Sequence, residues 1–383
     1  MNQYRMLALG GGDEIGASCY VLQMGNNHVL LDAGIRMRTA KYSFSAFPDT
    51  GMLSGVMGLD GLHELDAVFI SHAHLDHVGA LPSMIGSLGS VHIYSSPATP
   101  DFISAQYEDV KNAAEFSQVF AEGSNNLSMA SDHIITIRTG DTLHLKGLDA
   151  TFFHAGHIPG AVMTLLEDDN RKVLYSGDFY DLDQHTVKGA DIPDNIGKID
   201  TLICEATLAY SPYTSRNMIQ AEKITSAANR TGRVFIVVKS VGRAAETALA
   251  IRENIPDMDI WIDQSCAAGC RMCEKYGVKV FGDRIRLLED RRYIYAVEGV
   301  VIQSYSADTG GCEVIYENGL GLYNHAGRSG ILKLIAAVNP ERVIFVHGVP
   351  QRSKDSSIFD DIRDRFGSLI QAVQAQNGIE TAI

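Results

Sequence analysis

Short apolar runs alternate with amphipathic segments along most of the chain, and this alternation predicts a mixed α/β protein. Apolar runs at 20–24 and 28–31 flank a Gly25-Asn26-Asn27 turn and predict a β-hairpin. Further short strands are expected at the apolar runs 67–70, 91–94, 134–138, 150–154, 163–167, 173–175 and 201–204.

From about residue 219 the pattern changes to helices and strands in regular alternation. Helical spacing is present at 219–228, 244–253 and 268–276, and buried-strand patterns lie between these segments at 234–238 and 258–262. This stretch predicts a small α/β unit inserted into a larger fold. After it, we expect a helix at 331–338, a strand at 343–346 and a terminal helix at 357–376.

Composition predicts a soluble globular protein with one large domain and one smaller domain. The chain has 383 residues, of which 45% are apolar and 20% are charged. The first residues lack the basic and apolar pattern of an export signal, and no run of about 18 apolar residues occurs. Six cysteines in so long a chain fit a reducing compartment. We therefore expect a cytoplasmic protein that does not span a membrane.

The formal net charge of −14 argues at first against a nucleic-acid partner, because phosphate binding requires Lys and Arg. The charge is unevenly distributed along the chain. Residues 208–305 carry 14 Lys and Arg against 11 Asp and Glu, which gives +3 there and −17 in the remainder. The acidity lies outside the middle segment, and part of it could be carboxylates that bind metal.

The stretch SHAHLDHVGALP begins directly after the apolar run 67–70 and contains His72, His74, Asp76 and His77. Side chains two apart point the same way in an extended segment, so His72 and His74 can face one ion. Asp76 and His77, on the turn that follows, can face a second one. Surface loops sometimes collect histidines, but a position straight after a buried strand favours half of a two-metal site.

Three more candidate ligands follow other apolar strands. His157 lies in FHAGHIPGA, Asp178 in LYSGDF and His347 in IFVHG. Each is next to a glycine, which suits a ligand presented on a tight loop at one edge of a sheet. Any one of them alone would more often be structural. Together with the first cluster they form one set of candidate metal ligands.

The motifs GGGDEIGASCY, LLDAG, SHAHLDHVGALP, AGHIPGA and SGDF resemble, in this order, those of the metallo-β-lactamase fold. LICEATLA, VKSVGRAAE and NHAGRSGILKLIAAVNPERVIFVHG resemble motifs of the β-CASP nucleases within that fold. The resemblance implies an αββα sandwich with an inserted small α/β (β-CASP) domain. The expected divisions are a first part of the sandwich at 1–207, the insertion at 208–305 and a second part at 306–383.

The resemblance also implies two Zn²⁺ ions, with Mn²⁺ as the alternative. One would be held by His72, His74, His157 and Asp178, and the other by Asp76, His77, His347 and the same bridging Asp178. Asp32, in LLDAG, would orient ligands through hydrogen bonds. In isolation, Asp32 could equally be a turn residue that caps Ala33 and Gly34.

A phosphodiester hydrolase follows from this resemblance. The two metals would activate a water as hydroxide, and Asp76, Glu205 and His325 are the expected catalytic groups. His325 would supply a proton or a charge partner to the departing 3′ oxygen. Glu205 would hold and polarise the His325 ring. The alternative for His325 is a cap on the helix that begins near Ser329.

Arg243 lies where the VGRAAE motif precedes or opens a helix, so we expect it, with His325, to contact a substrate phosphate. The alternative is a surface arginine that pairs with Glu246. A histidine at position 347 resembles the RNA-processing branch of the family rather than the DNA-repair branch. The resemblance therefore implies single-stranded RNA as the expected substrate and a ribonuclease as the expected activity.

Other classes of function stay open: a nuclease of single-stranded DNA, a hydrolase of a small phosphodiester or signalling nucleotide, and a catalytically silent subunit that binds RNA or a protein. A homodimer is compatible with the sequence. Glu205 and His325 are only 120 residues apart, so the insertion is shorter than usual in the family and we expect it to enclose the substrate less completely.

Cys266, Cys270 and Cys273 have the spacing C-x3-C-x2-C. On a helix these positions share one face, so we expect buried core residues rather than an iron–sulfur cluster or a third metal.

Overall fold

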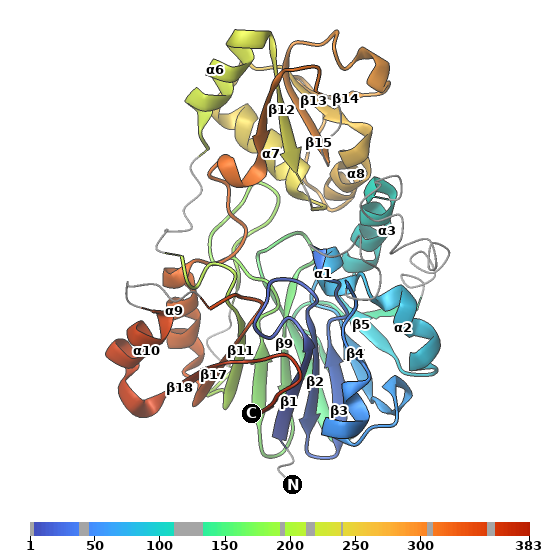
Figure 1. The fold of residues 1–383 in the computed structure, drawn as a ribbon, viewed down its shortest axis with the longest axis vertical. Coiled ribbons are helices and arrows are strands. Elements are labelled where there is room, and N and C mark those ends of the chain that lie inside the picture. Colours follow the sequence, from blue (N-terminus) through green and yellow to red (C-terminus); the bar gives the residue numbers. More distant parts are fainter. Residues whose placement is uncertain are drawn as a thin grey trace.

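Two β-sheets pack face to face with helices on both outer faces, and a smaller α/β unit lies above one edge of this sandwich (Figure 1). The computed structural model describes residues 4–37, 46–110, 133–191, 196–211, 219–238, 240–304, 309–350 and 357–383. This architecture confirms the α/β sandwich with an inserted domain that the sequence resemblance implies.

The first sheet has seven strands in the order β19-β1-β2-β3-β4-β5-β6. Its strands are β1 (Tyr4–Gly10), β2 (Cys19–Met24), β3 (Asn27–Leu31), β4 (Ala67–Phe69), β5 (Ile93–Ser95), β6 (Ile134–Thr136) and β19 (Glu380–Ala382). The expected hairpin is confirmed, since β2 and β3 pair antiparallel around a turn at Gly25, whose φ of 59° suits glycine. The helices α1 (Leu75–Val78), α2 (Leu81–Leu88) and α3 (Thr99–Val110) accompany this sheet.

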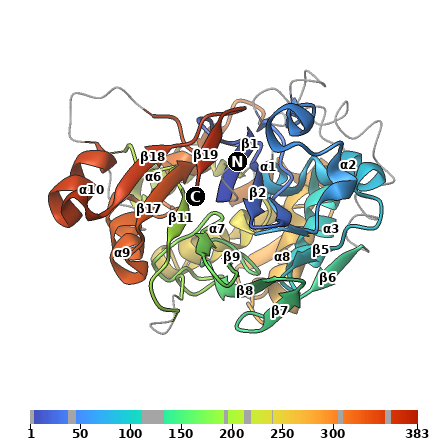
Figure 2. The same cartoon turned by 90° about the horizontal axis from the view of Figure 1, so that it is seen from below.

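The second sheet also has seven strands, in the order β18-β17-β11-β10-β9-β8-β7. They are β7 (Thr142–Leu145), β8 (Leu148–His154), β9 (Val162–Glu167), β10 (Lys172–Tyr175), β11 (Thr201–Glu205), β17 (Arg342–Val346) and β18 (Gln371–Gln374). The helices α9 (Arg328–Val338) and α10 (Ile358–Phe366) lie on the opposite side of the sandwich from α2 and α3 (Figure 2).

The space between the sheets is filled by apolar side chains from both inner faces. Tyr20 and Phe69 from the first sheet pack in one cluster with Phe152, Tyr175 and Ile203 from the second, and all five are buried. Burial of each such side chain contributes about 1.5–3 kcal/mol, so this layer fixes the two sheets against each other. The strand ends at the upper edge are therefore held in place.

The inserted unit has a parallel sheet of five strands in the order β14-β13-β15-β12-β16. They are β12 (Arg233–Val238), β13 (Ile260–Asp263), β14 (Ile285–Leu288), β15 (Gly299–Ser304) and β16 (Glu313–Tyr316), with the helices α6 (Ala221–Thr231), α7 (Arg243–Asn254) and α8 (Ala267–Lys275). The helices and strands expected at 219–276 are confirmed. Because β16 pairs with β12, the sheet extends beyond residue 305. The domain division remains our proposal, with its second boundary better placed after β16.

The expected terminal helix at 357–376 is wrong in its second half. The helix α10 ends at Phe366, where Gly367 has a φ of 66° that terminates a helix readily. Residues Gln371–Gln374 then alternate between exposed and half-buried positions as the edge strand β18. Within the described ranges, no helix is long and apolar enough to cross a membrane.

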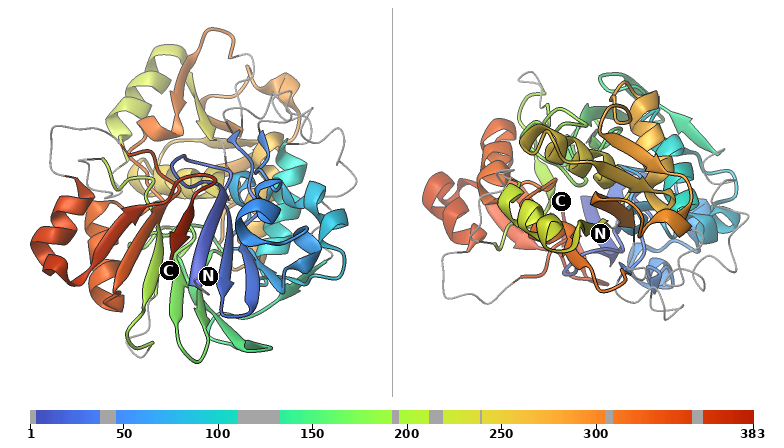
Figure 3. Two further views of the ribbon diagram at one scale, coloured as in Figure 1. Left: turned by 60° about the horizontal axis from the view of Figure 1, so that its bottom comes forward. Right: turned by 90° about the horizontal axis from the view of Figure 1, so that it is seen from above.

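The insertion contacts the sandwich through α8 and through the start of α7 (Figures 1 and 3). At α8, the Lys275 Nζ lies 2.6 Å from Asp101 Oδ2 on α3, and the Tyr276 hydroxyl donates to the same oxygen at 2.5 Å. At α7, the buried Glu246 accepts hydrogen bonds from the Thr186 backbone and hydroxyl, both at 2.9 Å. These contacts hold the insertion above the edge where the sandwich strands end.

His185 makes the α7 contact dependent on pH. Its Nδ1 lies 2.8 Å from Glu246 and its Nε2 lies 2.7 Å from Glu253. The hydrogen bond with Glu246 raises the pKa of His185 from 6.5 to about 9, even though burial lowers it. Because the folded-state pKa is raised, the stabilisation is complete below pH 6.5 and is lost as pH rises through about 9.

We expect His185→Gln to lower the thermal unfolding midpoint below pH 6.5, with a difference from wild type that fades as pH approaches about 9. Thermal unfolding of both proteins across this range checks the expectation. A difference that stays constant over the whole range would contradict it. Lys188→Gln is the control. Lys188 lies on the same loop as His185, and its exposed side chain pairs with Asp183 of that loop instead of with α7.

Candidate metal centre

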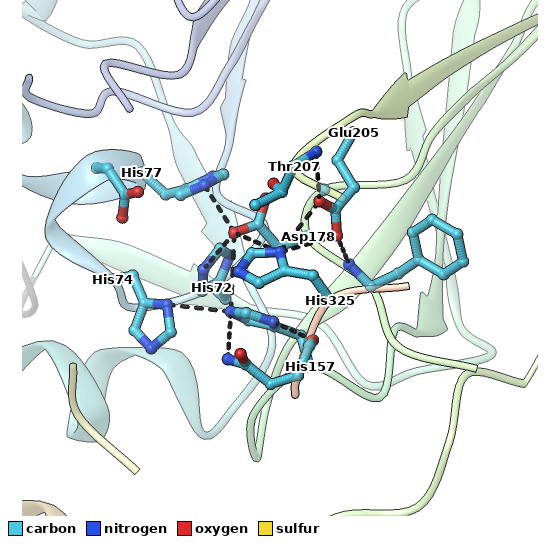
Figure 4. Close-up of polar contacts among 12 residues, drawn as sticks. His72, His74, His77, His157, Asp178, Glu205, Thr207 and His325 are labelled. Carbon is cyan, nitrogen blue, oxygen red and sulfur yellow. Dashed lines mark hydrogen bonds and ion pairs between the residues drawn. The ribbon is translucent and has the colours of Figure 1, made fainter. Parts of the chain in front are cut away.

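The predicted ligands converge at one edge of the sandwich, and Figure 4 shows five of them, namely His72, His74, His77, His157 and Asp178. Most of them lie on loops that follow β4, β8, β10 and β17, whereas Asp76 and His77 lie in the short helix α1 after β4. Glu205 is the last residue of β11. These strands end at the same edge, so loops far apart in the chain meet there. Asp76 and His347, for example, are 271 positions apart in sequence, with Asp76 Oδ2 and His347 Nε2 only 3.4 Å apart.

His72, His74, His157 and Asp178 form a first group, and all four side chains are buried. One ligand atom from each lies within 4.8 Å of those of the others. The closest pair is His74 Nδ1 and His157 Nε2, at 3.0 Å. Asp178 Oδ2 lies 3.7 Å from the Nε2 atoms of both His72 and His157. This is the set predicted for one metal.

Asp76, His77 and His347 form a second group beside the first. Asp178 touches this group as well, because its Oδ2 lies 3.2 Å from His77 Nε2 and its Oδ1 lies 3.5 Å from His347 Nδ1. The Asp178 carboxylate therefore stands between the two groups, which is the position expected of a bridging ligand.

The protonation states in the first group suit a cation. Burial, together with the neighbouring imidazoles, lowers the pKa of His72 and His157 well below the usual range, and burial lowers that of His74 to about 4. Neutral imidazole is the form that binds metal. Burial by itself raises the pKa of Asp178, but the histidines around it outweigh this effect and lower it.

Two buried ligand atoms in the first group have no hydrogen-bond partner among the described residues, namely His72 Nε2 and Asp178 Oδ1. Buried polar atoms without partners are rare in proteins and are readily explained by an ion. With nitrogen and oxygen donors only, this set fits a divalent metal, typically zinc.

Asp32 lies behind the second group. It is fully buried, its φ is 60°, and its Oδ2 accepts hydrogen bonds from Tyr175 at 2.6 Å and from Ser71 at 2.7 Å. The same oxygen lies 2.7 Å from His77 Nδ1. Burial lowers the pKa of His77, but Asp178 and Asp32 outweigh it and raise the pKa well above the usual range. A cation at the second group would replace the proton on Nε2 while Asp32 holds the proton on Nδ1. These contacts support an orienting role for Asp32.

We expect Asp32→Asn to weaken cation binding at the second group by about 10- to 100-fold, because His77 loses the carboxylate that fixes its ring. Titration of the metal-free protein with zinc against a chromogenic chelator checks this. Asp66→Asn is the matched control, since Asp66 accepts the His28 backbone N–H at 2.7 Å on the same sheet, away from the ligands. Equal zinc affinity in both variants would contradict the orienting role.

His325 and Glu205 form a pair next to Asp178. His325 Nδ1 lies 3.1 and 3.0 Å from the two Glu205 oxygens. Glu205 is itself held, since its Oε1 accepts from the Phe179 backbone N–H at 2.9 Å and its Oε2 from that of Thr207 at 3.3 Å. Burial lowers the pKa of His325, but Glu205 and Asp178 outweigh it and raise the pKa to about 9.

A cavity of about 440 Å³ opens beside His325 at the junction between the insertion and the sandwich. Its walls are largely apolar and aromatic, with Leu208, Val237, Tyr316, Leu322 and Tyr323 among the lining residues. Such a cavity offers space for part of a substrate next to the Glu205–His325 pair.

Arg243 opens helix α7, as expected, but its guanidinium is not exposed. It is only 2% exposed and bonds with Glu317, with Gln184 Oε1 at 3.1 Å and with the Leu322 carbonyl at 3.3 Å. It therefore does not pair with Glu246 at the surface, which was the alternative reading. The contacts indicate a structural role, and contact with a substrate phosphate remains only a prediction.

Thr207 and Tyr175 support the site and were missed from the sequence. The Thr207 hydroxyl lies 2.9 Å from His347 Nδ1 and donates to the His347 carbonyl at 3.3 Å, so it holds that ring. Thr207 follows Glu205 in the acidic motif, and this adjacency could have signalled it. Tyr175 lies in an apolar strand and gave no signal.

The three cysteines of the C-x3-C-x2-C motif are buried around helix α8, as expected for core residues. Burial raises the pKa of the Cys273 thiol to about 12, which opposes the thiolate form needed to bind metal. Among the described residues, no candidate metal group contains a cysteine.

Comparisons with known proteins agree with this geometry. The family model described as the metallo-beta-lactamase superfamily matches residues 12–180. That of the Zn-dependent metallo-hydrolase RNA specificity domain matches residues 317–356. A solved structure of a protein of unknown function from Enterococcus faecalis covers 99% of this chain and all of its own chain at a TM-score of 0.62, but its 13% identity shows the fold alone.

Curated relatives carry ribonuclease names. Probable RNase MJ4 of Methanocaldococcus jannaschii is 31% identical over 66% of this chain and 58% of its own length. Endoribonuclease ysh1 of Aspergillus fumigatus is 30% identical over 74% of this chain and 33% of its own length. The chain thus spans little more than half of the first relative and a third of the second. From these matches and the arrangement of the site, the chain belongs to the β-CASP branch of the metallo-β-lactamase superfamily.

Proposed function

We propose that this protein is a zinc-dependent phosphodiester hydrolase that cleaves single-stranded RNA. The observation that carries the proposal is the position of Asp178, which contacts both histidine groups and lies 3.8 Å from His325. Two groups of candidate metal ligands share one carboxylate, and the Glu205–His325 pair lies beside them. This arrangement suits attack of an activated water on a phosphodiester.

One zinc would be held by His72, His74, His157 and Asp178, and a second by Asp76, His77, His347 and Asp178; Mn²⁺ is the alternative cation. When bound, a metal pair lowers the pKa of a coordinated water and stabilises charge on the phosphate oxygens. Asp76 is 21% exposed, so its carboxylate reaches the open side of the second group. We assign it both as a ligand and as a catalytic group.

His325 is the proposed general acid. Its Nδ1 faces Glu205, so its Nε2 is the atom that can hold a proton for the departing 3′ oxygen. Two backbone N–H groups anchor the Glu205 carboxylate, which therefore fixes the orientation of the His325 ring. The negative charge of Glu205 favours the protonated form of that ring. The side chain of His325 is 20% exposed, which leaves it accessible to a substrate.

RNA is the proposed substrate because the relatives are named ribonucleases and because the RNA specificity model spans the segment that carries His325 and His347. The cavity beside His325 has aromatic walls, which suit stacking with a nucleobase. A cytoplasmic location and a homodimer remain predictions from the sequence.

The test is to incubate zinc-loaded protein with end-labelled single-stranded RNA and DNA of the same sequence and to read the product lengths. Faster cleavage of RNA supports the proposal, and the product ladder separates internal from terminal cleavage. Faster cleavage of DNA would transfer the assignment to a DNA nuclease. Absence of cleavage of every phosphodiester offered would overturn it.

A second candidate is a hydrolase of a small phosphodiester or signalling nucleotide. The net charge of −14 favours it, because a long polyanion is repelled more than a dinucleotide. Including a cyclic dinucleotide in the same assay separates the two, since turnover of the dinucleotide with no cleavage of long RNA would support this candidate.

A further inference from the structure

Two ligands of the first group are held by backbone carbonyls from outside the loops that carry the ligands. His74 Nε2 lies 3.2 Å from the Val241 carbonyl oxygen, and His157 Nδ1 lies 2.7 Å from that of Asn324. A carbonyl oxygen only accepts hydrogen bonds, so each histidine carries its proton on this outer nitrogen. The inner nitrogens, His74 Nδ1 and His157 Nε2, are thereby left unprotonated and 3.0 Å apart, with Asn324 Nδ2 3.5 Å from His157 Nε2.

These carbonyls come from the insertion and from the segment that leads out of it. Val241 lies between β12 and α7, and Asn324 lies between β16 and α9. The other histidines with a fixed outer nitrogen are held from within the sandwich, since Ser71 lies 3.0 Å from His72 Nδ1 and Asp32 lies 2.7 Å from His77 Nδ1. Only part of the first group therefore depends on where the insertion sits.

The segment that carries Val241 is held in place by the start of α7. Glu246 accepts hydrogen bonds from the backbone and hydroxyl of Thr186, and from the backbone and ring of His185 at 3.2 and 2.8 Å. Glu246 is 1% exposed, so water does not compete for it. Glu246 lies five positions after Val241, and Arg243 between them is buried as well.

Arg243 connects the same segment to the second histidine. It donates to Gln184 Oε1 at 3.1 Å, and Gln184 Nε2 donates to the backbone carbonyls of Gly156 at 2.7 Å and His157 at 2.9 Å. Arg243 also reaches the Leu322 carbonyl, two residues before Asn324. Arg243 thus connects the segment of Val241 and the segment of Asn324 to the loop that carries His157.

We propose that docking of the insertion and metal binding at the first group are coupled, through the Val241 and Asn324 carbonyls. The inference rests on the proposed metal centre. When the insertion is docked, His74 and His157 are fixed with the free nitrogen inward, so the metal binds tightly. Because linkage is reciprocal, bound metal in turn favours the docked insertion.

Glu246→Gln tests the first direction. In the wild type, groups of His185 and Thr186 donate hydrogen bonds to the Glu246 carboxylate. The variant amide presents an N–H₂ group to these donors, so the segment around Val241 should loosen. Loss of an outer partner typically lowers metal affinity by about 10- to 100-fold, and we expect a decrease of that size in zinc affinity measured by chelator competition. Thermal unfolding of the metal-free variant establishes that it folds.

Glu313→Gln is the matched control. It is the same change of charge inside the insertion, where Glu313 on β16 pairs with Arg230 on α6 and belongs to neither of the contacts with the sandwich described above. Loss of affinity in Glu246→Gln that clearly exceeds that in Glu313→Gln supports the proposal. If Glu246→Gln binds zinc as wild type does, the coupling is wrong while the metal centre stands. If wild type itself binds no zinc, the proposed function fails.

Amide hydrogen exchange of the unmodified protein tests the second direction. Addition of zinc should slow exchange at the ligand loops and also where α8 meets α3, a contact that includes none of the metal ligands. Protection at that distant contact reports docking rather than ligation. Protection confined to the ligand loops would overturn the coupling.

Discussion

Asp178→Asn should lower kcat/KM on single-stranded RNA by at least about 1000-fold, because metal ions supply several kcal/mol of charge stabilisation and each 1.36 kcal/mol is a factor of about ten. Asp178 is the only carboxylate of the first group and also contacts His77 of the second. An amide in its place removes the negative charge that faces both cations. Elemental analysis should therefore show metal loss together with the loss of activity.

Asp183→Asn is the control for this result. Asp183 lies on the same loop, binds Lys188 at 2.7 Å and is 62% exposed, so its replacement removes an aspartate without reaching the site. It should keep wild-type activity and metal content. If Asp178→Asn retained both metals and full activity, the carboxylate would not bridge the groups and the proposed centre would be wrong.

The convergence of the candidate ligands was predictable because their signal is local. His72, His74, Asp76 and His77 lie within six residues directly after an apolar strand. His157 and His347 could be added because each follows another apolar strand, and strand ends of one orientation meet at one sheet edge. Assigning each ligand to a particular metal required the family resemblance, since spacing alone does not say which histidine faces which ion.

The support around the ligands was less predictable, for a physical reason. Val241 and Asn324 act through backbone carbonyls, and every residue has one, so their side chains carry no signal. Arg243 was expected at a substrate phosphate because it opens a helix. Its burial could not be foreseen, since its partner Glu317 lies 74 residues away and only folding brings the two together. A sequence shows that an arginine opens a helix, but not whether a distant acid buries it.

The same limit applies to the fold. The buried strands were predictable as apolar runs, for example β10 and β11. The edge strand β18 (Gln371–Gln374) has a polar sequence, QAVQ, that an amphipathic helix could equally contain. Its pairing with β17 decides its structure, and tertiary pairing of this kind outweighs local preference.

His325→Gln should lower kcat on RNA by about 10²- to 10⁴-fold, the usual contribution of a general acid. The same variant should hydrolyse a p-nitrophenyl phosphodiester almost as fast as wild type, because that leaving group departs as a stable anion and needs no proton. Zinc content should stay unchanged, since His325 belongs to neither of the two proposed zinc sites. The measurement is therefore a ratio of two substrates on one protein preparation.

His144→Gln supplies the matched control, because His144 also pairs with a carboxylate, Asp149 at 2.8 Å, but its side chain is 75% exposed on β7. It should leave both rates as they are. A loss on the p-nitrophenyl substrate as large as that on RNA would contradict acid catalysis, since the ring would then be needed whatever the leaving group. Selective loss on RNA, by contrast, locates the departing oxygen on the side of the site where Glu205 holds His325.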